Sequence, residues 1–268
     1  MSGIERIAEA FASARASGRT AALMPYLMGG FPDLETSRRI GIAYAEGGAD
    51  LIELGVPFSD PLADGPVIHA AGTAALRAGA TVDRVLDVGR QIAEHVPVVV
   101  MCYANPIYAR GLERFADAIA SAGASGLIVP DLPLEEAPAV LEACDARGLA
   151  LVPLVAPTTP DERLAQIGAR ARGFLYTVLL TGATGERAGV DGALARVVSR
   201  AAASAQVPVA VGFGIGTPEQ AVAAAAAGAD GVIVGSRLVR AAGEGGEGGD
   251  PVNQVLELVR GFSGALLG

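Results

Sequence analysis

The sequence predicts one closed barrel in which parallel strands alternate with helices. Short apolar runs recur along the chain, and each is followed by turn residues and then by a helical spacing of apolar residues. Three segments, which begin at Gly47, Ala122 and Ala227, repeat a helix end of small residues followed by a buried strand. Repeated units of this kind are typical of alternating β/α folds. Eight of them fit a TIM-type (β/α)8 barrel, an α/β fold, with an extra N-terminal helix.

The expected strands are eight apolar runs. They cover residues 21–28, 51–56, 97–103, 126–129, 149–155, 173–179, 207–211 and 230–234. Residues 4–11 have the spacing of an amphipathic helix, and helical spacing returns from Pro251 to Leu267. A doubly wound open sheet is the alternative, although no GxGxxG sequence follows the first strand. We expect residues 1–268 to form a single barrel domain.

Charge and composition disfavour several classes of partner. The 268 residues carry a net charge of −9, with an isoelectric point near 4.8, which argues against nucleic acid and anionic membrane surfaces. No run of about 20 apolar residues would span a membrane. The N-terminus has the pattern of a helix and not of a signal peptide, so we expect a cytoplasmic protein.

The set of side chains available for catalysis is restricted. All 20 basic residues are arginines, so the chain cannot form a lysine Schiff base. His69 and His95 lie far apart in the sequence and belong to no metal-binding pattern, and Cys102 and Cys144 fit neither a disulfide framework nor a metal site. We therefore expect no metal in this chain, two cysteines in the core, and acid–base chemistry by carboxyl groups and tyrosines.

The most informative stretch is DLIELGVPFSDPLADGP, which begins at Asp50. Glu53 stands in the middle of an apolar strand, where an ionised carboxylate is costly unless it is paired or its pKa is raised. A structural ion pair or a solvent-facing side chain is the alternative. Asp64 follows in a loop rich in Pro, Asp and Gly. Two acids brought to one cleft in this way can have different environments and therefore different pKa values.

Three glycine-bearing turns follow the last three strands, where this fold places phosphate groups. They are residues 182–185, 212–216 and 235–236. The second turn runs into a capping pattern at Thr217, and the third opens directly into a short helix, so backbone N–H groups there would bind a dianion without lysine. Ordinary tight turns are the alternative. Residues 180–192 are small and polar, and we expect a mobile loop in which Thr184 could bond to Asp64.

Six segments together resemble the tryptophan synthase α subunit family. They are ELGVPFSDPLADGP, YANPIY, PDLPLEE, TGATGERAG, VGFGI and GVIVGS, in this order and over nearly the whole chain. The resemblance implies a carbon–carbon lyase of tryptophan biosynthesis that cleaves indole-3-glycerol phosphate to indole and D-glyceraldehyde 3-phosphate. It also implies an α2β2 heterotetramer, in which indole passes to a β subunit that carries pyridoxal phosphate. No cofactor is then expected in this chain.

The resemblance also implies roles for individual residues. The catalytic residues would be Glu53, Asp64 and Tyr176. The phosphate-binding residues would be Gly185, Gly214, Gly235 and Ser236. The substrate pocket or its neighbourhood would contain Tyr26, Asp131 and Phe213, and we add Thr184 to this group. The loop 57–65, with Pro57 and Asp60, and the pair Asn105 and Pro106 are expected at the interface with the β subunit.

The chemistry of the residues agrees with this resemblance. A retro-aldol cleavage needs an electron sink, and neither a lysine imine nor a metal is expected here. Protonation of the indole ring at C3 by Glu53 would create the sink, Asp64 would accept the indole N–H, and Tyr176 would position Glu53 or the substrate. Two alternatives stay open: another phosphate-binding barrel enzyme, such as an isomerase or epimerase, or a non-catalytic barrel subunit that binds phosphate ligands and activates a partner enzyme.

Overall fold

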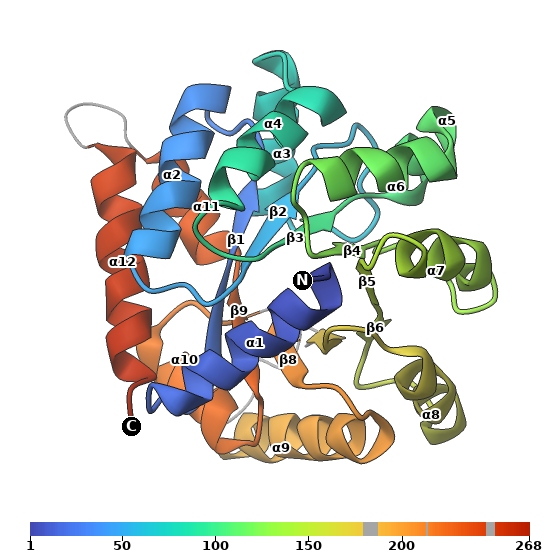
Figure 1. The fold of residues 1–268 in the computed structure, drawn as a ribbon. Helices are drawn as coiled ribbons and strands as arrows, with labels where there is room; N and C mark the ends of the chain where they lie inside the picture. The colour runs from blue at the N-terminus through green and yellow to red at the C-terminus, as the bar shows by residue number, and fades with distance from the viewer. Residues whose placement is uncertain (179–186, 213, 245–249) are drawn as a thin grey trace.

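In the computed structural model of the protein, the described strands form one barrel. The structure describes residues 1–178, 187–212, 214–244 and 250–268. The strands are β1 (Ala22–Met28), β2 (Ile52–Gly55), β3 (Val98–Met101), β4 (Gly126–Ile128), β5 (Ala150–Val152), β6 (Leu154–Val155), β7 (Leu175–Val178), β8 (Val209–Gly212) and β9 (Gly231–Val234). They pair in parallel in the order β5-β4-β3-β2-β1-β9-β8-β7-β6. Helices surround them (Figure 1), which confirms the predicted TIM-type barrel.

The predicted fifth strand, residues 149–155, is divided in two, so the expectation of a single strand is wrong in this detail. Pro153 separates β5 from β6 and has no N–H group to donate to a neighbouring strand. Its carbonyl oxygen still accepts the N–H of Tyr176 at 3.0 Å. Because β5 and β6 are the two ends of the strand order, this continuous segment closes the sheet into a barrel.

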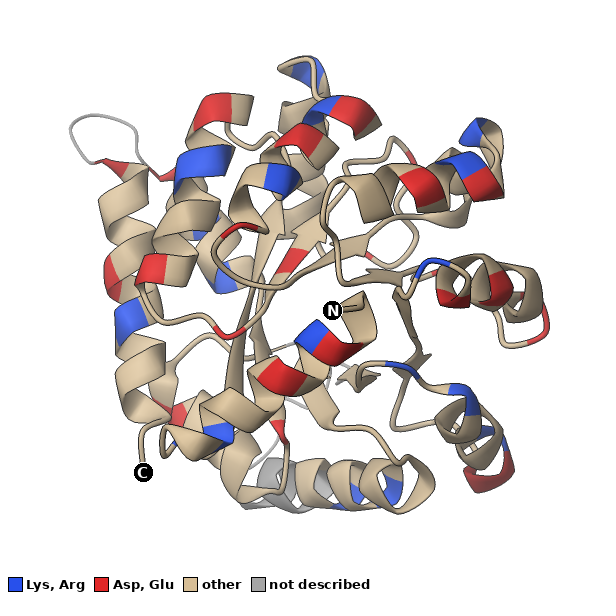
Figure 2. Ribbon diagram, in the orientation of Figure 1, with Lys and Arg blue, Asp and Glu red and all other residues tan. Residues whose placement is uncertain are grey.

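The helices form an outer layer. They are α1 (Gly3–Ala16), α2 (Leu34–Glu46), α3 (Pro66–Arg77), α4 (Val82–Ile92), α5 (Ala104–Arg110), α6 (Leu112–Ser121), α7 (Ala137–Asp145), α8 (Asp161–Arg170), α9 (Arg187–Ser204), α10 (Pro218–Ala226), α11 (Ser236–Gly243) and α12 (Pro251–Ala265). Figure 2 shows acidic and basic residues spread over these helices. Side chains cap several starts, including Asp33 before α2, Thr81 before α4 and Thr217 before α10, as their positions predict.

The segment 180–192 is only partly a loop. Helix α9 begins at Arg187, so residues 187–192 are helical, and the expectation of a loop up to Gly192 is wrong for them. The glycines of this stretch suggest a loop. The Ala, Leu and Arg residues that follow are strong helix formers, and α9 extends from them back over the glycines to Arg187. Residues 179–186 lie outside the described part of the chain.

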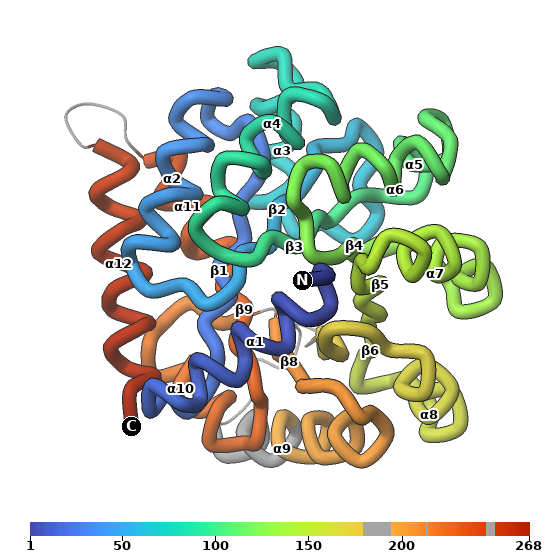
Figure 3. The backbone as a smooth tube through the Cα atoms, in the orientation of Figure 1, coloured from blue at the N-terminus to red at the C-terminus, as the bar shows by residue number. Residues whose placement is uncertain are grey.

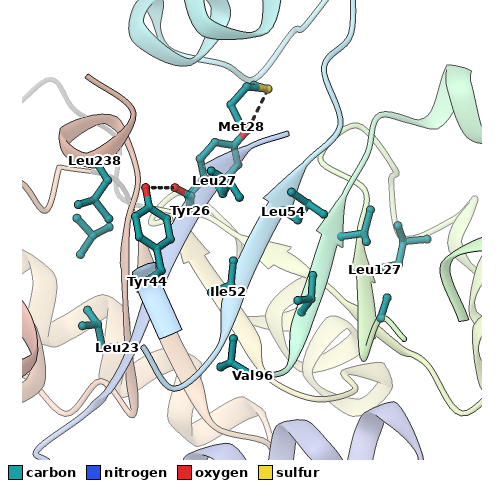
Figure 4. Close-up of a cluster of buried hydrophobic side chains, with 14 of the residues drawn as sticks. Leu23, Tyr26, Leu27, Met28, Tyr44, Ile52, Leu54, Val96, Leu127 and Leu238 are labelled. Atoms are coloured by element: carbon teal, nitrogen blue, oxygen red, sulfur yellow. Dashed lines mark hydrogen bonds between the residues drawn. The ribbon is translucent and has the colours of Figure 1, made fainter. Parts of the chain in front are cut away.

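Two hydrophobic layers hold the barrel together. The outer layer lies between strands and helices and includes Leu27, Leu54 and Leu127, which Figure 4 shows. The inner layer fills the barrel and includes Ile7 and Phe11 of α1 beside residues at the strand starts. Helix α1 therefore covers the N-terminal mouth of the barrel, as Figure 1 shows, and the strand C-termini are the end left for a ligand. Cys102 and Cys144 are both buried, as predicted.

The N-terminal and C-terminal segments of the chain pack on the same side of the barrel. Helix α12 packs against α2 and α11, so the last helix lies beside the first helix that follows a strand (Figure 3). A β-bridge between Arg19 and Leu267 adds a second contact between the terminal segments. Among the described helices, none combines the length and the apolar character needed to cross a membrane.

Candidate active site

A cavity of about 500 Å³ opens where the strands end, on the side of the barrel opposite to α1. One part of its wall carries acids and tyrosines: Glu53, Asp64, Tyr26 and Tyr176. The other part carries glycines, helix starts and arginines: Gly214, Gly216, Gly235, Ser236, Arg237 and Arg240. Apolar side chains lie between, among them Ile68, Met101, Ile215 and Ile233. The cavity thus combines an acid–base end with an end suited to an anion.

Glu53 is a buried acid without a partner. It lies on β2, in register with Tyr26 of β1 and Val99 of β3, and it is 1% exposed. Neither carboxyl oxygen has a hydrogen-bond partner among the described residues. Burial, helped by the nearby Asp64 carboxylate, raises the pKa of Glu53 to about 8. The side chain therefore holds a proton at neutral pH, and the alternative of a structural ion pair finds no partner in the described part of the chain.

Asp64 has a different environment. The hydroxyl of Tyr103 donates a 2.8 Å hydrogen bond to Oδ1 of Asp64 and accepts the N–H of Ala63 at 3.0 Å. Burial raises the pKa of Asp64, while the Tyr103 hydrogen bond and the His69 side chain lower it. The aromatic ring of Tyr103 packs against Phe58, with ring centroids 5.4 Å apart. The two acids of the cavity are thus held differently, as the sequence predicts.

Tyr26 and Tyr176 lie at the acid end on strands β1 and β7. Each hydroxyl lies over a glycine of the neighbouring strand, Gly55 or Gly212, and a Cβ atom at either glycine would collide with it. Figure 4 shows Tyr26 beside Tyr44, whose hydroxyl donates to the Tyr26 carbonyl oxygen at 3.4 Å. Burial and the nearby acids raise the pKa of both cavity tyrosines. Their phenols therefore stay protonated and can donate hydrogen bonds to a substrate.

The two helix starts at the anion end differ in their free donors. At α10, Gln220 Oε1 accepts the N–H groups of Gly216 and Thr217, at 2.8 and 3.1 Å, and the Thr217 hydroxyl accepts the N–H of Gln220. This capping box, which the sequence predicts, already occupies these backbone N–H groups, so they are not free for a ligand. At α11, no side chain caps the first turn. The backbone N–H groups that no side chain occupies are therefore those of Gly235 and Ser236 at the start of α11, and the two helix starts are not equivalent.

The structure does not bring every predicted site residue to the cavity. Asp131 does not line it: its Oδ1 accepts the N–H of Ala104 at 2.9 Å and so caps the start of α5. One oxygen of its carboxylate is used by that helix end, and a role for Asp131 in or near the pocket stays a prediction. Thr184, Gly185 and Phe213 lie outside the described residues. Glu53, Asp64, Tyr176, Tyr26, Gly214, Gly235 and Ser236 all line the cavity.

The predicted partner-contact residues are unequally exposed. Asp60 and Asn105 are exposed, Pro106 is half-buried, and Pro57 is buried within the chain. Pro57 is thus covered within this chain, and its place at the interface stays a prediction. The same two segments expose two large apolar side chains that the sequence does not single out, Leu62 of the loop 57–65 at 86% and Tyr108 of α5 at 49%.

Several cavity residues carry no recognisable signal in the sequence. Tyr103, which supports Asp64 without lining the cavity, follows a predicted strand end where this fold places active residues, but its bond to Asp64 depends on the path of the loop. Ile68, Met101, Ile215 and Ile233 resemble any other core residues in the sequence. A signal does exist for Arg237 and Arg240, since GSRLVR places two cations at the start of the helix after the last glycine turn.

A second hollow, of about 610 Å³, lies between α7 and α8 on the outside of the barrel. Leu134, Pro138 and Leu141 line it, and its acid Asp145 is paired with Arg172 at 3.3 Å. It offers no buried acid comparable to Glu53. The described residues also contain no group of three or more His, Cys, Asp or Glu side chains placed to hold a metal ion.

Comparison with known proteins gives a consistent result. Residues 11–264 match the family described as tryptophan synthase alpha chain. The tryptophan synthase alpha chain of Prochlorococcus marinus is 49% identical over 238 residues, which cover 87% of this chain and 86% of the relative. That of Methanosarcina mazei is 46% identical over 252 residues, 94% of this chain and 90% of the relative.

Solved structures agree with the sequence relatives. A chain of Mycobacterium tuberculosis tryptophan synthase superposes with a TM-score of 0.89 at 40% identity, covering 98% of both chains. The tryptophan synthase alpha chain of Legionella pneumophila superposes with a TM-score of 0.88 at 34% identity, covering 99% of this chain and 97% of the other. On the matched length, the identity and the shared barrel, the chain belongs to the tryptophan synthase alpha chain family.

Proposed function

We propose that the cavity binds indole-3-glycerol phosphate, the substrate of this family, and that Glu53 starts its cleavage to indole and D-glyceraldehyde 3-phosphate. One observation carries the assignment of Glu53. Its carboxyl group is buried, lacks a hydrogen-bond partner among the described residues, and has a pKa raised to about 8. A protonated acid that serves no structural contact is what a general acid requires at neutral pH.

The reaction can be written with Glu53 as both acid and base. Its proton is transferred to C3 of the indole ring, which leaves a cationic ring that can accept electrons. The Glu53 carboxylate then removes the proton of the hydroxyl on the glycerol carbon attached to C3. The bond from C3 to that carbon breaks, its electron pair enters the ring to restore neutral indole, and the carbon becomes the aldehyde. Glu53 ends with a proton again, so protons and electrons balance.

Asp64 would stabilise the positive charge that develops on the indole ring. An ionised carboxylate accepting the indole N–H serves this purpose. The hydrogen bond donated by Tyr103 favours the ionised form and works against the effect of burial on the pKa of Asp64. Tyr176, which is in the same cavity and stays protonated, would orient Glu53 or the glycerol hydroxyls.

The phosphate group would lie at the opposite end of the cavity. The distance between the two ends is set by the barrel, because Glu53 belongs to β2 while Gly235 and Ser236 follow β9. Binding energy from the phosphate would therefore hold the indole ring over Glu53, which is how a remote group contributes to a reaction. Gly185 belongs to the same proposed site and lies outside the described residues.

We also propose that the chain works with a partner. Several solved relatives carry the name tryptophan synthase, the whole enzyme, and in this family indole passes to a β subunit that holds the pyridoxal phosphate. By this proposal the chain is a single barrel domain of a cytoplasmic α2β2 assembly and itself needs no cofactor. The loop 57–65 and the start of α5, which Asp131 caps, would form part of the contact.

The test is an assay of the isolated full-length chain with indole-3-glycerol phosphate. Release of indole and glyceraldehyde 3-phosphate in equal amounts is expected. Binding of glycerol 3-phosphate should be measured in parallel by calorimetry. A chain that binds glycerol 3-phosphate, releases no indole and yet activates a β subunit would be the non-catalytic subunit considered as the alternative.

A further inference from the structure

Two arginines lie on the anion end of the cavity without an assigned role. Arg237 and Arg240 are three residues apart on α11, so they lie on the same face of that helix, and both line the cavity. Side chains of a helix lean toward its N-terminus. From its place on α11, Arg240 can thus reach back toward Gly235 and Ser236.

The surroundings of these arginines are not those of a surface ion pair. Some arginines of the protein are paired with acids, such as Arg163 with Glu135 at 2.7 Å and Arg200 with Asp161 at 2.7 Å. Neither Arg237 nor Arg240 makes a side-chain hydrogen bond or salt bridge with any residue in the described ranges. Their charges are thus available at the cavity wall.

The position of Arg237 is locally unfavourable without a ligand. It is the second residue of α11, where the helix dipole is positive and repels a cation. The first turn of α11 has neither an acidic residue nor a side-chain cap that would offset this. At α10, by contrast, Gln220 and Thr217 satisfy the backbone donors of the helix start. The start of α11 therefore combines two arginines with uncapped backbone N–H groups. A bound anion would balance this positive charge.

We propose that Arg237 and Arg240 bind the phosphate dianion of the substrate together with the backbone donors of Gly235 and Ser236. This inference rests on the proposed function. It assigns part of the affinity of the cavity for the substrate phosphate to Arg237 and Arg240, in addition to the glycine turns. In a chain with a net charge of −9, the pair supplies the local positive charge that a dianionic ligand needs. The two guanidinium groups select phosphate esters over uncharged analogues, while the chemistry stays at Glu53.

The experiment measures binding of glycerol 3-phosphate to the full-length chain by calorimetry, at low and at moderate salt. Arg237→Gln and Arg240→Gln should each raise the dissociation constant about three- to tenfold, the range expected for a partly exposed charge-assisted hydrogen bond. The double variant should weaken binding further and show a smaller dependence on salt. With indole-3-glycerol phosphate, KM should rise more than kcat falls.

Two controls make the result specific. Arg114→Gln removes an arginine from the first turn of another helix, α6, that does not line the cavity, and should leave the dissociation constant unchanged. Arg240→Lys keeps the charge and should retain part of the lost affinity. Thermal unfolding of every variant shows whether the fold is intact.

The outcomes separate this inference from the proposed function. If the wild-type chain releases indole but the double variant binds glycerol 3-phosphate as tightly as Arg114→Gln does, the arginine assignment is wrong and the lyase assignment stands. If the wild-type chain neither binds glycerol 3-phosphate nor releases indole, the proposed function itself fails.

Discussion

The hydroxyl of Tyr103 donates a 2.8 Å hydrogen bond to Oδ1 of Asp64, across 39 positions of sequence. The same hydroxyl accepts the N–H of Ala63, so one phenol fixes both the backbone of the loop and its carboxylate. Because a hydrogen bond donated to a carboxylate favours the ionised form, the contact lowers the pKa of Asp64 against the effect of burial. Tyr103 thus links the end of β3 to the electrostatic role proposed for Asp64.

Replacing Tyr103 by Phe tests this link. The ring that packs on Phe58 is kept, but the donor to Asp64 is lost, so the fold should persist while kcat/KM for indole-3-glycerol phosphate falls about tenfold. The pKa of Asp64 should rise, which moves the acidic limb of the pH–rate profile to higher pH. The matched control is Tyr108→Phe, at an exposed tyrosine of α5. Equal profiles for both variants would contradict a positioning role.

Glu53→Gln removes the titratable proton and nearly preserves the shape of the side chain. Cleavage should fall by about 10⁴-fold or more, the upper end for acid–base groups, because Glu53 is proposed to act as acid and as base. Glycerol 3-phosphate should still bind, and the Tm should not fall, since no described partner is left unpaired. Glu46→Gln, at an exposed glutamate of α2, is the control. A Glu53→Gln variant that still cleaves the substrate would refute the mechanism.

The raised pKa of Glu53 also predicts how stability depends on pH. The pKa is near 4.5 in the unfolded chain and about 8 in the folded one, so the folded state binds more protons between these values. Stability from this group is complete below about pH 4.5 and is lost as pH rises toward 8. The loss should reach several kcal/mol, since one pKa unit corresponds to about 1.4 kcal/mol.

This pH effect can be isolated by comparing the wild type with Glu53→Gln. The variant has no group that titrates at this position. From pH 5 to pH 8 the wild type should therefore lose unfolding free energy relative to Glu53→Gln. Urea denaturation at one-unit steps measures it. A difference that stays constant over this range would mean that Glu53 ionises in the folded protein as it does in water.

The exposed surface near the cavity predicts the energetics of partner binding. Leu62 is 86% exposed and lies in the loop 57–65, where part of the partner contact is proposed. Leu62→Ser should weaken the complex with the β subunit about tenfold, as loss of a buried apolar contact does. Val222→Ser, at another exposed apolar residue, on α10, should not. Calorimetric titration of both variants with the β subunit distinguishes them.

The sequence by itself determined the order and type of most elements and the identity of the acid. Periodicity and capping residues such as Asp33, Thr81 and Thr217 act over a few neighbouring positions, so they can be recognised without the fold. Glu53 was recognisable for the same reason, because an acid inside an apolar strand is costly wherever that strand lies. The absence of lysine, which restricts the chemistry, is likewise a property of the sequence alone.

Only the tertiary structure decided which side chains make contacts between segments that are distant in the sequence. The sequence does not show that residues 150–155 close the barrel or that Asp131 accepts the first N–H of α5. Each of these depends on where a loop or helix end lies relative to a distant strand. The same holds for the bond from Tyr103 to Asp64 and for the place of the α11 arginines at the cavity, because strands far apart in sequence end at one mouth of the barrel.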